Sequence, residues 1–304
     1  MAKPIRIAGL LRRTPTARAA SNVLRAVLLD LLERVPEARG GDSRKGIHDL
    51  RVTVKRFREA FRLFRPVLRK KTFRRHREWI EDLNDALGEV RDRDVALVQL
   101  EKLTAGLAER PRSVADLLAR LESERLASAG ALAAMLDRLQ LEGVPAQLAA
   151  RIESIEQEAA SGAPTHEFAR ERVRERLLDV RARWTAARRE ATPESLHRVR
   201  IGNKRLRYSI EPFSRMLGKE VRRLYRSASR FHDALGDLHD ADSMAVLLET
   251  AMAGASKAER RAWERLSVKV IRERRVALRK AFSHADKLEP LWDEAQRAVE
   301  VPPL

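Results

Sequence analysis

Residues 47–64 read IHDLRVTVKRFREAFRLF, and a second stretch at residues 196–213 reads LHRVRIGNKRLRYSIEPF. Both contain the order H-x-x-R-x-x-x-K-R-x-R, and each member of the second copy lies 149 positions after its counterpart, as His197 does after His48. A repeat of this length predicts that the chain is built from two similar halves, each centred on one copy of this stretch.

Each stretch has the pattern of a helix with two distinct faces. At about 100° per residue, the cationic residues of the first stretch fall within an arc of about 80°. They are His48, Arg51, Lys55, Arg58 and Arg62. A second narrow arc, about 120° away, is apolar. It holds Leu50, Val54, Phe57, Phe61 and Phe64, and the second stretch repeats it as Val199, Leu206, Ile210 and Phe213, with Asn203 replacing Val54. We therefore expect two helices that each present an apolar seam to a core and a separate cationic seam; they are called the cationic helices below.

The remainder of the chain also has helical periodicity, and alternating strand-like runs are nearly absent. We expect further helices at about residues 16–35, 71–103, 112–141, 145–159, 167–187, 219–250 and 257–285, followed by a short terminal helix. Pro36 and the Gly40-Gly41 pair should end the first of them, and Asp42 or Ser43 should cap the first cationic helix. The predicted fold class is all-α, as two tandem-duplicated helical bundles.

The predicted organisation has three parts. Residues 1–15 form a basic arm with two prolines, residues 16–160 the first half, and residues 165–304 the second half. The sequence SGAP at residues 161–164 is the best candidate for the boundary between the halves.

Charge is the strongest global signal. The 304 residues include 62 Lys and Arg against 44 Asp and Glu, for a formal net charge of +18. Such a balance implies a polyanionic partner, which could be nucleic acid, an anionic membrane surface or a phosphate polymer. The simpler alternative is a generally arginine-rich proteome, but two cationic seams at matching positions argue against it.

Several classes of protein are disfavoured by what the sequence lacks. There is no cysteine, which excludes disulfides and thiolate sites. No apolar run is long enough to span a membrane, so no membrane insertion is expected. The N-terminal apolar piece is too short for a signal peptide, so we expect a cytoplasmic protein.

A second motif is also repeated, at an offset of 148. LNDALGEVRDRD at residues 83–94 corresponds to FHDALGDLHDAD at residues 231–242. The shared acids should pair with arginines of the cationic helices and hold those side chains in place; they are Asp85, Asp92, Asp94, Asp233, Asp240 and Asp242. Glycine within a helix costs about 1 kcal/mol relative to alanine. Gly88 and Gly236 therefore indicate close packing against a neighbouring backbone, or a local break in the helix.

The same region admits a metal-site interpretation. His232, His239 and Asp240 could contribute ligands for a divalent cation. The first half has Asn84 and Arg91 in place of the two histidines, so the feature common to both halves is carboxylate. The sequence therefore favours structural acids, and we predict no metal and no cofactor.

His48 and His197 head their cationic rows, and three roles are open to them: phosphate contact, structural capping and metal ligation. Neighbouring Arg and Lys side chains should lower the pKa of both imidazoles unless an anion lies close by. We favour phosphate contact.

Motifs that would identify an enzyme are missing. The sequence contains no Gly-rich phosphate loop, no G-x-S-x-G and no H-E-x-x-H, and nothing in it identifies a nucleophile. We predict a protein that is not an enzyme.

The two motifs, in this order in both halves, resemble the CHAD family, named for conserved histidines in an α-helical domain. The resemblance spans nearly the whole chain. It implies two four-helix bundles related by a pseudo-two-fold axis, with a basic central channel or groove that binds inorganic polyphosphate. Some members accompany polyphosphate granules, so the resemblance also implies such an association.

Carried over residue by residue, the resemblance implies phosphate contacts from the cationic helices. They are His48, Arg51, Lys55, Arg56, Arg58, Arg62, His197, Arg200, Lys204, Arg205, Arg207 and Tyr208. Arginines on neighbouring helices could extend the row: Arg25, Arg174, Arg74, Arg75, Arg222, Arg223 and Arg226. The halves are not identical, because Tyr208 is matched by Glu59 and Glu211 by Arg62.

The function predicted from the sequence is non-catalytic binding of inorganic polyphosphate. Rows of Arg forks and Lys charges on rigid helices suit a chain of regularly spaced anionic oxygens. One alternative is a nucleic-acid-binding protein, but only 5% of the residues are aromatic and no nucleic-acid-binding signature appears, so only non-specific binding is expected. A metal-dependent phosphohydrolase is the less favoured second alternative.

Overall fold

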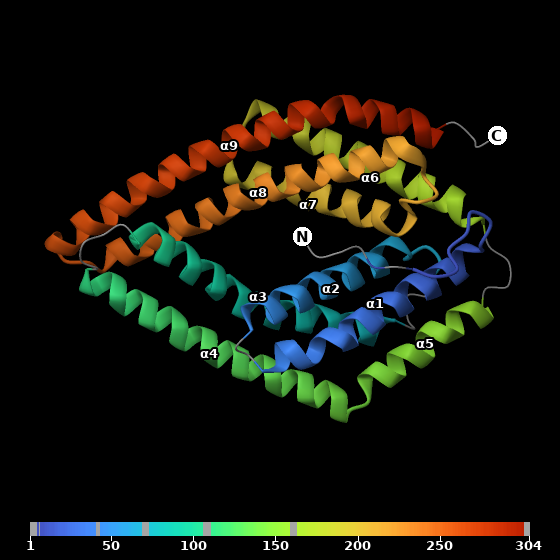
Figure 1. Cartoon of the computed structure of the whole chain (residues 1–304), viewed down its shortest axis with the longest axis horizontal. Helices are drawn as coiled ribbons and strands as arrows, with labels where there is room; N and C mark the ends of the chain where they lie inside the picture. The colour runs from blue at the N-terminus through green and yellow to red at the C-terminus, as the bar shows by residue number, and fades with distance from the viewer. Residues whose placement is uncertain are drawn as a thin grey trace.

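The computed structural model describes residues 5, 7–40, 43–68, 73–105, 111–158 and 163–300. In these residues the chain forms nine α-helices, one short 3-10 helix and no β-strand (Figure 1), which confirms the predicted all-α class. The elements are α1 (Thr16–Arg39), α2 (Arg44–Leu63), α3 (Arg74–Thr104), α4 (Arg112–Leu141), α5 (Val144–Glu158), α6 (Thr165–Arg189), α7 (Pro193–Ile210), η1 (Glu211–Phe213), α8 (Gly218–Ala253) and α9 (Lys257–Glu300).

Two helices extend past prolines and beyond the ends that the sequence predicted for them. Pro36 lies inside α1, which ends at Arg39 with Gly40 of the expected glycine pair as its C-cap. Pro290 lies inside α9, which continues to Glu300 although the sequence predicted an end near residue 285 and a separate short helix after it. A proline removes only one backbone hydrogen bond, and packing beyond it can compensate. Beyond Pro290 the helix buries Trp292 and Ala295 in the core, and this burial keeps α9 continuous.

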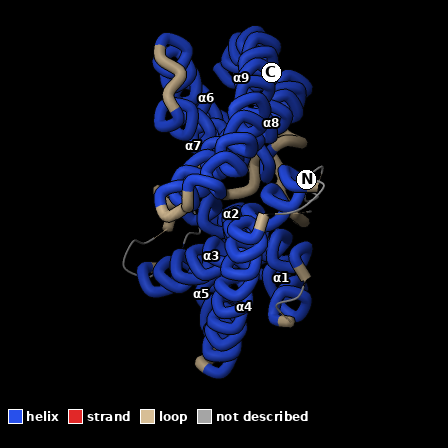
Figure 2. Tube along the Cα trace, turned by 90° about the vertical axis from the view of Figure 1, so that its left-hand side faces the viewer, coloured by secondary structure: helices blue, strands red, loops and turns tan. Residues whose placement is uncertain are grey.

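The two cationic helices are α2 and α7, and they pack against each other. Helices α1 to α5 occupy the lower part of the molecule and α6 to α9 the upper part, both in the cartoon (Figure 1) and in the view turned by 90° (Figure 2). Each cationic helix also packs between two neighbours of its own half, α2 between α1 and α3, and α7 between α6 and α8. The two helices that carry the predicted cationic seams therefore meet near the middle of the fold.

The main hydrophobic core includes residues from both halves. Phe64 stacks on Phe168 with ring centroids 5.4 Å apart, and Phe213 packs edge-on against both rings, at 6.0 and 6.3 Å. A second apolar cluster joins the far ends of four helices, with Leu100 from α3 and Leu248 from α8 among its members. The halves thus share apolar contacts in two places.

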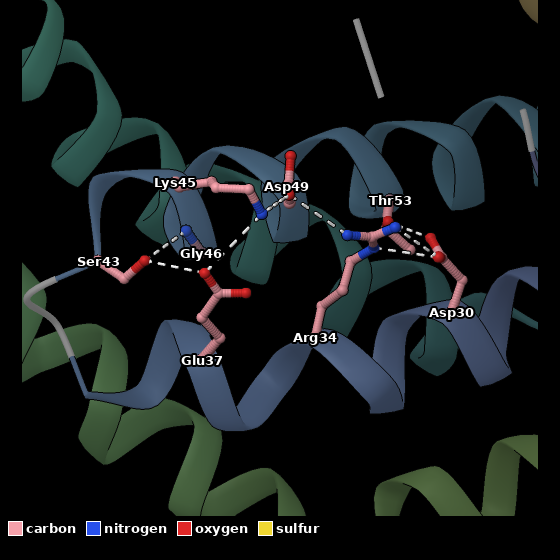
Figure 3. A network of polar contacts seen from close by, with 8 residues as sticks. All are labelled: Asp30, Arg34, Glu37, Ser43, Lys45, Gly46, Asp49 and Thr53. Carbon is pink, nitrogen blue, oxygen red and sulfur yellow. Dashed lines mark hydrogen bonds and ion pairs between the residues drawn. The ribbon is translucent and has the colours of Figure 1, made fainter. Parts of the chain in front are cut away.

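A polar network fixes α2 against α1 (Figure 3). The Ser43 hydroxyl caps α2 by accepting from the Gly46 backbone N–H at 2.8 Å; Asp42, the other expected cap, lies outside the described residues. A Cβ at Gly46 would lie 2.9 Å from the Glu37 backbone, so only glycine permits this approach of α1 and α2. Arg34 joins Asp30 and Asp49, at 2.8 and 3.5 Å.

The described part of the N-terminal arm meets the boundary between the halves. The Thr165 N–H donates to the Thr14 carbonyl at 2.9 Å, and the Thr16 N–H donates to the Ala163 carbonyl at 3.1 Å. Residues 161–162 of the expected boundary lie outside the described residues. Among the helices that are described, none has an apolar stretch sufficient to cross a lipid bilayer.

Candidate functional site

The contact between α2 and α7 gathers cations from both helices. Lys55 of α2 interacts electrostatically with Arg200 and Lys204 of α7, and Lys204 interacts in turn with Arg58 and Arg62 of α2. We call this group the central cluster; it comprises Arg51, Lys55, Arg58, Arg62, Arg200, Lys204 and Arg207. All seven belong to the site predicted from the sequence, and the fold brings them to one place rather than two.

Lys55 has the most informative electrostatics of the cluster. Burial, followed by the charges of Arg51, Arg200 and Lys204, lowers the pKa of Lys55 from 10.5 to about 7. Burial is also the main cause that lowers the pKa values of Arg200 and Lys204. These half-buried cations repel one another, so an anion placed among them would relieve an existing electrostatic cost.

Four histidines border the central cluster. Burial lowers the pKa of His48, with a further contribution from Arg91, and burial lowers the pKa of His197, with a further contribution from His239. The direction agrees with the expectation from neighbouring cations, although burial is the larger cause. His197 and His239 lie with ring centroids 5.1 Å apart.

The other two bordering histidines, His232 and His239, were not assigned to the phosphate site by the sequence. Burial and then Arg207 lower the pKa of His232 well below its usual value, while burial and then Arg200 lower the pKa of His239. Arg91 of α3 also interacts with both His48 and Asp240. The sequence could have indicated Arg91 as a site residue, because the 148-residue repeat makes it the counterpart of His239.

Gly88 and Gly236 each lie beneath an arginine of the central cluster. A Cβ at Gly88 would meet the Arg51 Nη2 at 3.6 Å, and one at Gly236 would meet the Arg200 Nη2 at 4.0 Å. Helices α3 and α8 run through both positions without interruption, so the expected local break is wrong. The close neighbour is a guanidinium group and not a backbone.

The six repeated acids fall into three equivalent pairs. Asp92 accepts from Arg51 at 3.0 Å, and its counterpart Asp240 interacts with Arg200, so both face the cationic helices as expected. Asp94 is fully buried and pairs with Arg125 of α4 at 2.7 Å and with Arg44 of α2 at 3.5 Å.

The remaining acids differ from the expectation. Asp242, the counterpart of Asp94, pairs with Arg274 of α9 at 2.5 Å, so its arginine comes from the following helix and not from α7. Asp85 accepts from Asn84 at 2.9 Å and is exposed, as is Asp233. Within the described residues, His, Asp and Glu side chains do not gather in threes in a way that could hold a metal ion.

Carboxylates contact the first-half cations of the central cluster. Glu81 of α3 accepts from Arg58 at 2.5 Å, and Glu59 of α2 accepts from Arg62 at 2.8 Å. Glu59 also lies 3.9 Å from the Lys204 Nζ. On the second-half side, Arg207 donates from Nε to the Ser229 hydroxyl at 2.9 Å and lies over the Tyr225 ring.

Three predicted contacts border the central cluster without being counted in it; Tyr208 interacts with its members Arg200 and Arg207. The buried Arg56 pairs with Glu211 at 2.9 Å, and Tyr208 lines a small pocket beside this pair together with Ile5 of the N-terminal arm. Burial raises the pKa of Tyr208 to about 12, so this phenol stays protonated. Arg205 interacts with Glu59 and Arg62 and, beyond them, with arginines of α6.

Asn203 fits the apolar seam because its amide donates to the Ala228 carbonyl at 2.8 Å.

The seven arginines proposed to extend the row are dispersed. Arg74 lines a pocket with Arg58 and Arg62, whereas Arg75 stacks over Trp79 and Arg223 pairs with Glu294 at 3.0 Å. Arg222 lines a different pocket, beside the N-terminal arm. The others are exposed residues whose part in a site stays a prediction: Arg25, Arg174 and Arg226.

Comparison with known proteins agrees with this fold. The family model of the CHAD domain matches residues 22–249. The crystal structure of the CHAD domain from the plant Ricinus communis is similar over 100% of this chain and 98% of that one, with a TM-score of 0.70 and 20% identity. PptA from Streptomyces chartreusis is similar over 90% of this chain and 100% of that one, with a TM-score of 0.63 and 17% identity. No curated protein matches the sequence. The family match covers most of the chain, so the resemblance drawn from the two repeated motifs is confirmed: the chain belongs to the CHAD domain family.

Proposed function

We propose that this protein binds inorganic polyphosphate, without catalysis, at the central cluster. The observation that carries the proposal is the gathering of half-buried cations from two helices where α2 meets α7; burial and then the neighbouring charges lower the pKa of Lys55 there to about 7. A bound polyanion would replace the repulsion among these cations with attraction.

The chemistry of the cluster favours a phosphate polymer. Its members are five arginines and two lysines, which offer planar forks and mobile point charges to phosphate oxygens. Tyr225, an aromatic residue beside the cluster, has Arg207 over its ring. Its ring face is therefore already engaged, which disfavours the stacking of bases that binding of single-stranded nucleic acid uses.

We further propose that residues 16–160 and 165–304 form two pseudo-symmetric helical bundles with a shared basic groove between them, and that one site serves the whole chain. Repeated contacts support this arrangement. Arg51 lies over Gly88 as Arg200 lies over Gly236, and Asp94 pairs with α4 as Asp242 pairs with α9. A cytoplasmic location, with association to polyphosphate granules, belongs to the same proposal.

Calorimetric titration with long-chain polyphosphate, beside single- and double-stranded DNA at about physiological salt, tests the proposal. We expect one polyphosphate site per chain, no release of orthophosphate, and much weaker binding of either DNA. Equal affinity for all three polymers would favour a general polyanion binder, and released orthophosphate would favour a phosphohydrolase.

Paired substitutions locate the site. Arg51→Ala/Lys55→Ala and Arg200→Ala/Lys204→Ala should each weaken polyphosphate binding by about 10-fold or more, because each removes two charges from one shared site. Arg181→Ala/Arg188→Ala removes the same charge from α6, where both arginines pair with α9, and should change the affinity little. Unchanged affinity in both cluster variants would refute the site.

A further inference from the structure

Beside the charge differences at Glu59/Tyr208 and Arg62/Glu211, the two ends of the central cluster differ in charge at a further pair of equivalent positions. Glu81 of α3 lies 148 positions before Ser229 of α8, the same offset that relates the repeated acidic motifs. The arginines that these residues contact, Arg58 and Arg207, are themselves counterparts in the repeat. At these equivalent positions, therefore, Arg58 contacts the carboxylate of Glu81 and Arg207 contacts the hydroxyl of Ser229.

Glu81 holds two cations of the cluster at once. Its Oε2 lies 2.5 Å from the Arg58 Nη2, and its Oε1 lies 3.7 Å from the Arg62 Nη2. The side chain of Glu81 is 44% exposed, whereas that of Glu59, the other carboxylate at this end, is only 7% exposed. An exposed ion pair is weak, so Glu81 can turn into solvent when a stronger anion takes its place.

A basic pocket opens beside this pair. Arg58 and Arg62 line it together with Glu81, and its volume is about 440 Å³. Three more arginines line it, Arg65 from the segment after α2 and Arg74 and Arg77 from α3, and they outnumber the two further acids of the lining, Glu78 and Asp82. A polyphosphate chain that leaves the central cluster at this end would meet these arginines, but only after Glu81 has released Arg58; Arg62 is paired more closely with Glu59, at 2.8 Å, than with Glu81, at 3.7 Å.

We propose that Glu81 is an internal competitor that makes binding depend on polyphosphate length, an inference that rests on the proposed function. Short chains bind among Lys55, Arg200 and Arg207 and leave Glu81 in place. Long chains also reach Arg58 and Arg62, displace Glu81, and continue into the basic pocket. Glu81 is thus a positioning residue that sets chain-length preference.

Replacement of Glu81 tests this directly. Glu81→Ser introduces the residue found at the equivalent position, and Glu81→Gln keeps the size without the charge. In calorimetric titrations, both variants should bind long-chain polyphosphate about 3- to 10-fold more tightly than the unmodified protein, because no anion has to be displaced. Affinity for tripolyphosphate should stay within about 2-fold.

Two controls separate this effect from general electrostatics and from misfolding. Glu153→Ser makes the same chemical change at an exposed position of α5 and should leave both affinities within about 2-fold. Thermal unfolding without ligand shows whether a variant has lost its fold. If one Glu81 variant is unfolded, the affinities of the other Glu81 variant test the role of Glu81.

The outcomes distinguish the two proposals. An equal gain for tripolyphosphate and for the long chain, an equal gain in Glu153→Ser, or no gain in a folded Glu81 variant would each overturn the role of Glu81 while leaving the binding function intact. If the unmodified protein binds neither polymer, the proposed function itself is refuted.

Discussion

At the scale of single residues, protonation should respond to ligand binding. Lys55 has a pKa of about 7 in the free protein because it is buried among Arg51, Arg200 and Lys204. Beside it, His232 and His239 are held neutral by burial and by the same cations. The acids that interact with this group are Asp92 of α3, which acts on Lys55 and His239, and Asp242 of α8, which acts on His239. A bound phosphate chain would raise the pKa values of the lysine and the histidines.

The first prediction concerns proton uptake. Below about pH 7 Lys55 is already charged in the free protein, whereas at about pH 8 it is mostly neutral and must take up a proton when polyphosphate raises its pKa. Affinity should therefore fall as pH rises above about 7. Titration calorimetry at about pH 8, in buffers with different ionisation enthalpies, measures the uptake directly.

Lys55→Arg is the matched variant for this prediction. It keeps a cation at the position but does not titrate in this range, so polyphosphate binding should persist while most of the uptake at about pH 8 disappears. An undiminished uptake in Lys55→Arg would show that Lys55 is not the titrating group.

At the scale of elements, the two glycines of α3 and α8 provide space for arginine side chains of the cationic helices. A Cβ at Gly236 would lie 4.0 Å from the Arg200 Nη2, which is an ordinary van der Waals contact, so alanine fits there. A larger residue would occupy the position of the guanidinium group. The small size of these glycines therefore lets the guanidinium groups of Arg51 and Arg200 lie close to the backbones of α3 and α8.

The second prediction separates helix stability from binding at this position. Gly236→Ala should stabilise the protein by about 0.5–1 kcal/mol, because alanine is the better helix former, and should leave polyphosphate affinity nearly unchanged. Gly236→Leu should displace Arg200 and weaken binding by about 10-fold. Denaturant unfolding and calorimetric titration of the two variants check both parts; equal affinities would refute the space-keeping role.

At the scale of the whole molecule, the buried Arg56–Glu211 pair joins α2 of the first half to η1 of the second. The side chains are 7% and 9% exposed, so removing one partner leaves a buried charge without its counterion. The shared core around Phe64 and Phe168 crosses the same boundary. We therefore expect the halves to unfold together.

The third prediction follows from this pair. Glu211→Leu should lower the free energy of unfolding by about 3–5 kcal/mol, while the double change Arg56→Met/Glu211→Leu should recover most of that loss, because an apolar pair avoids the desolvation cost. Urea unfolding followed by circular dichroism should give a single transition in each case. Two separated transitions would show that the halves unfold independently.

The amino-acid sequence by itself determined the helical class and the family, because periodicity and repeated motifs are local properties of the chain. Its twelve predicted contacts include the seven cations of the central cluster, since their spacing places them on one face of each helix, but the sequence did not separate these seven from the others. It did not predict the continuation of α9 past Pro290, which depends on burial of Trp292 in the core. Whether the two cationic seams meet could only be decided by packing, because side chains on α2 and α7 are brought together by contacts between helices far apart in the chain. For the same reason the sequence could not reveal that Glu81 reaches Arg58, that Arg56 is used in a buried ion pair, or that Lys55 is crowded enough to lose its proton near neutral pH.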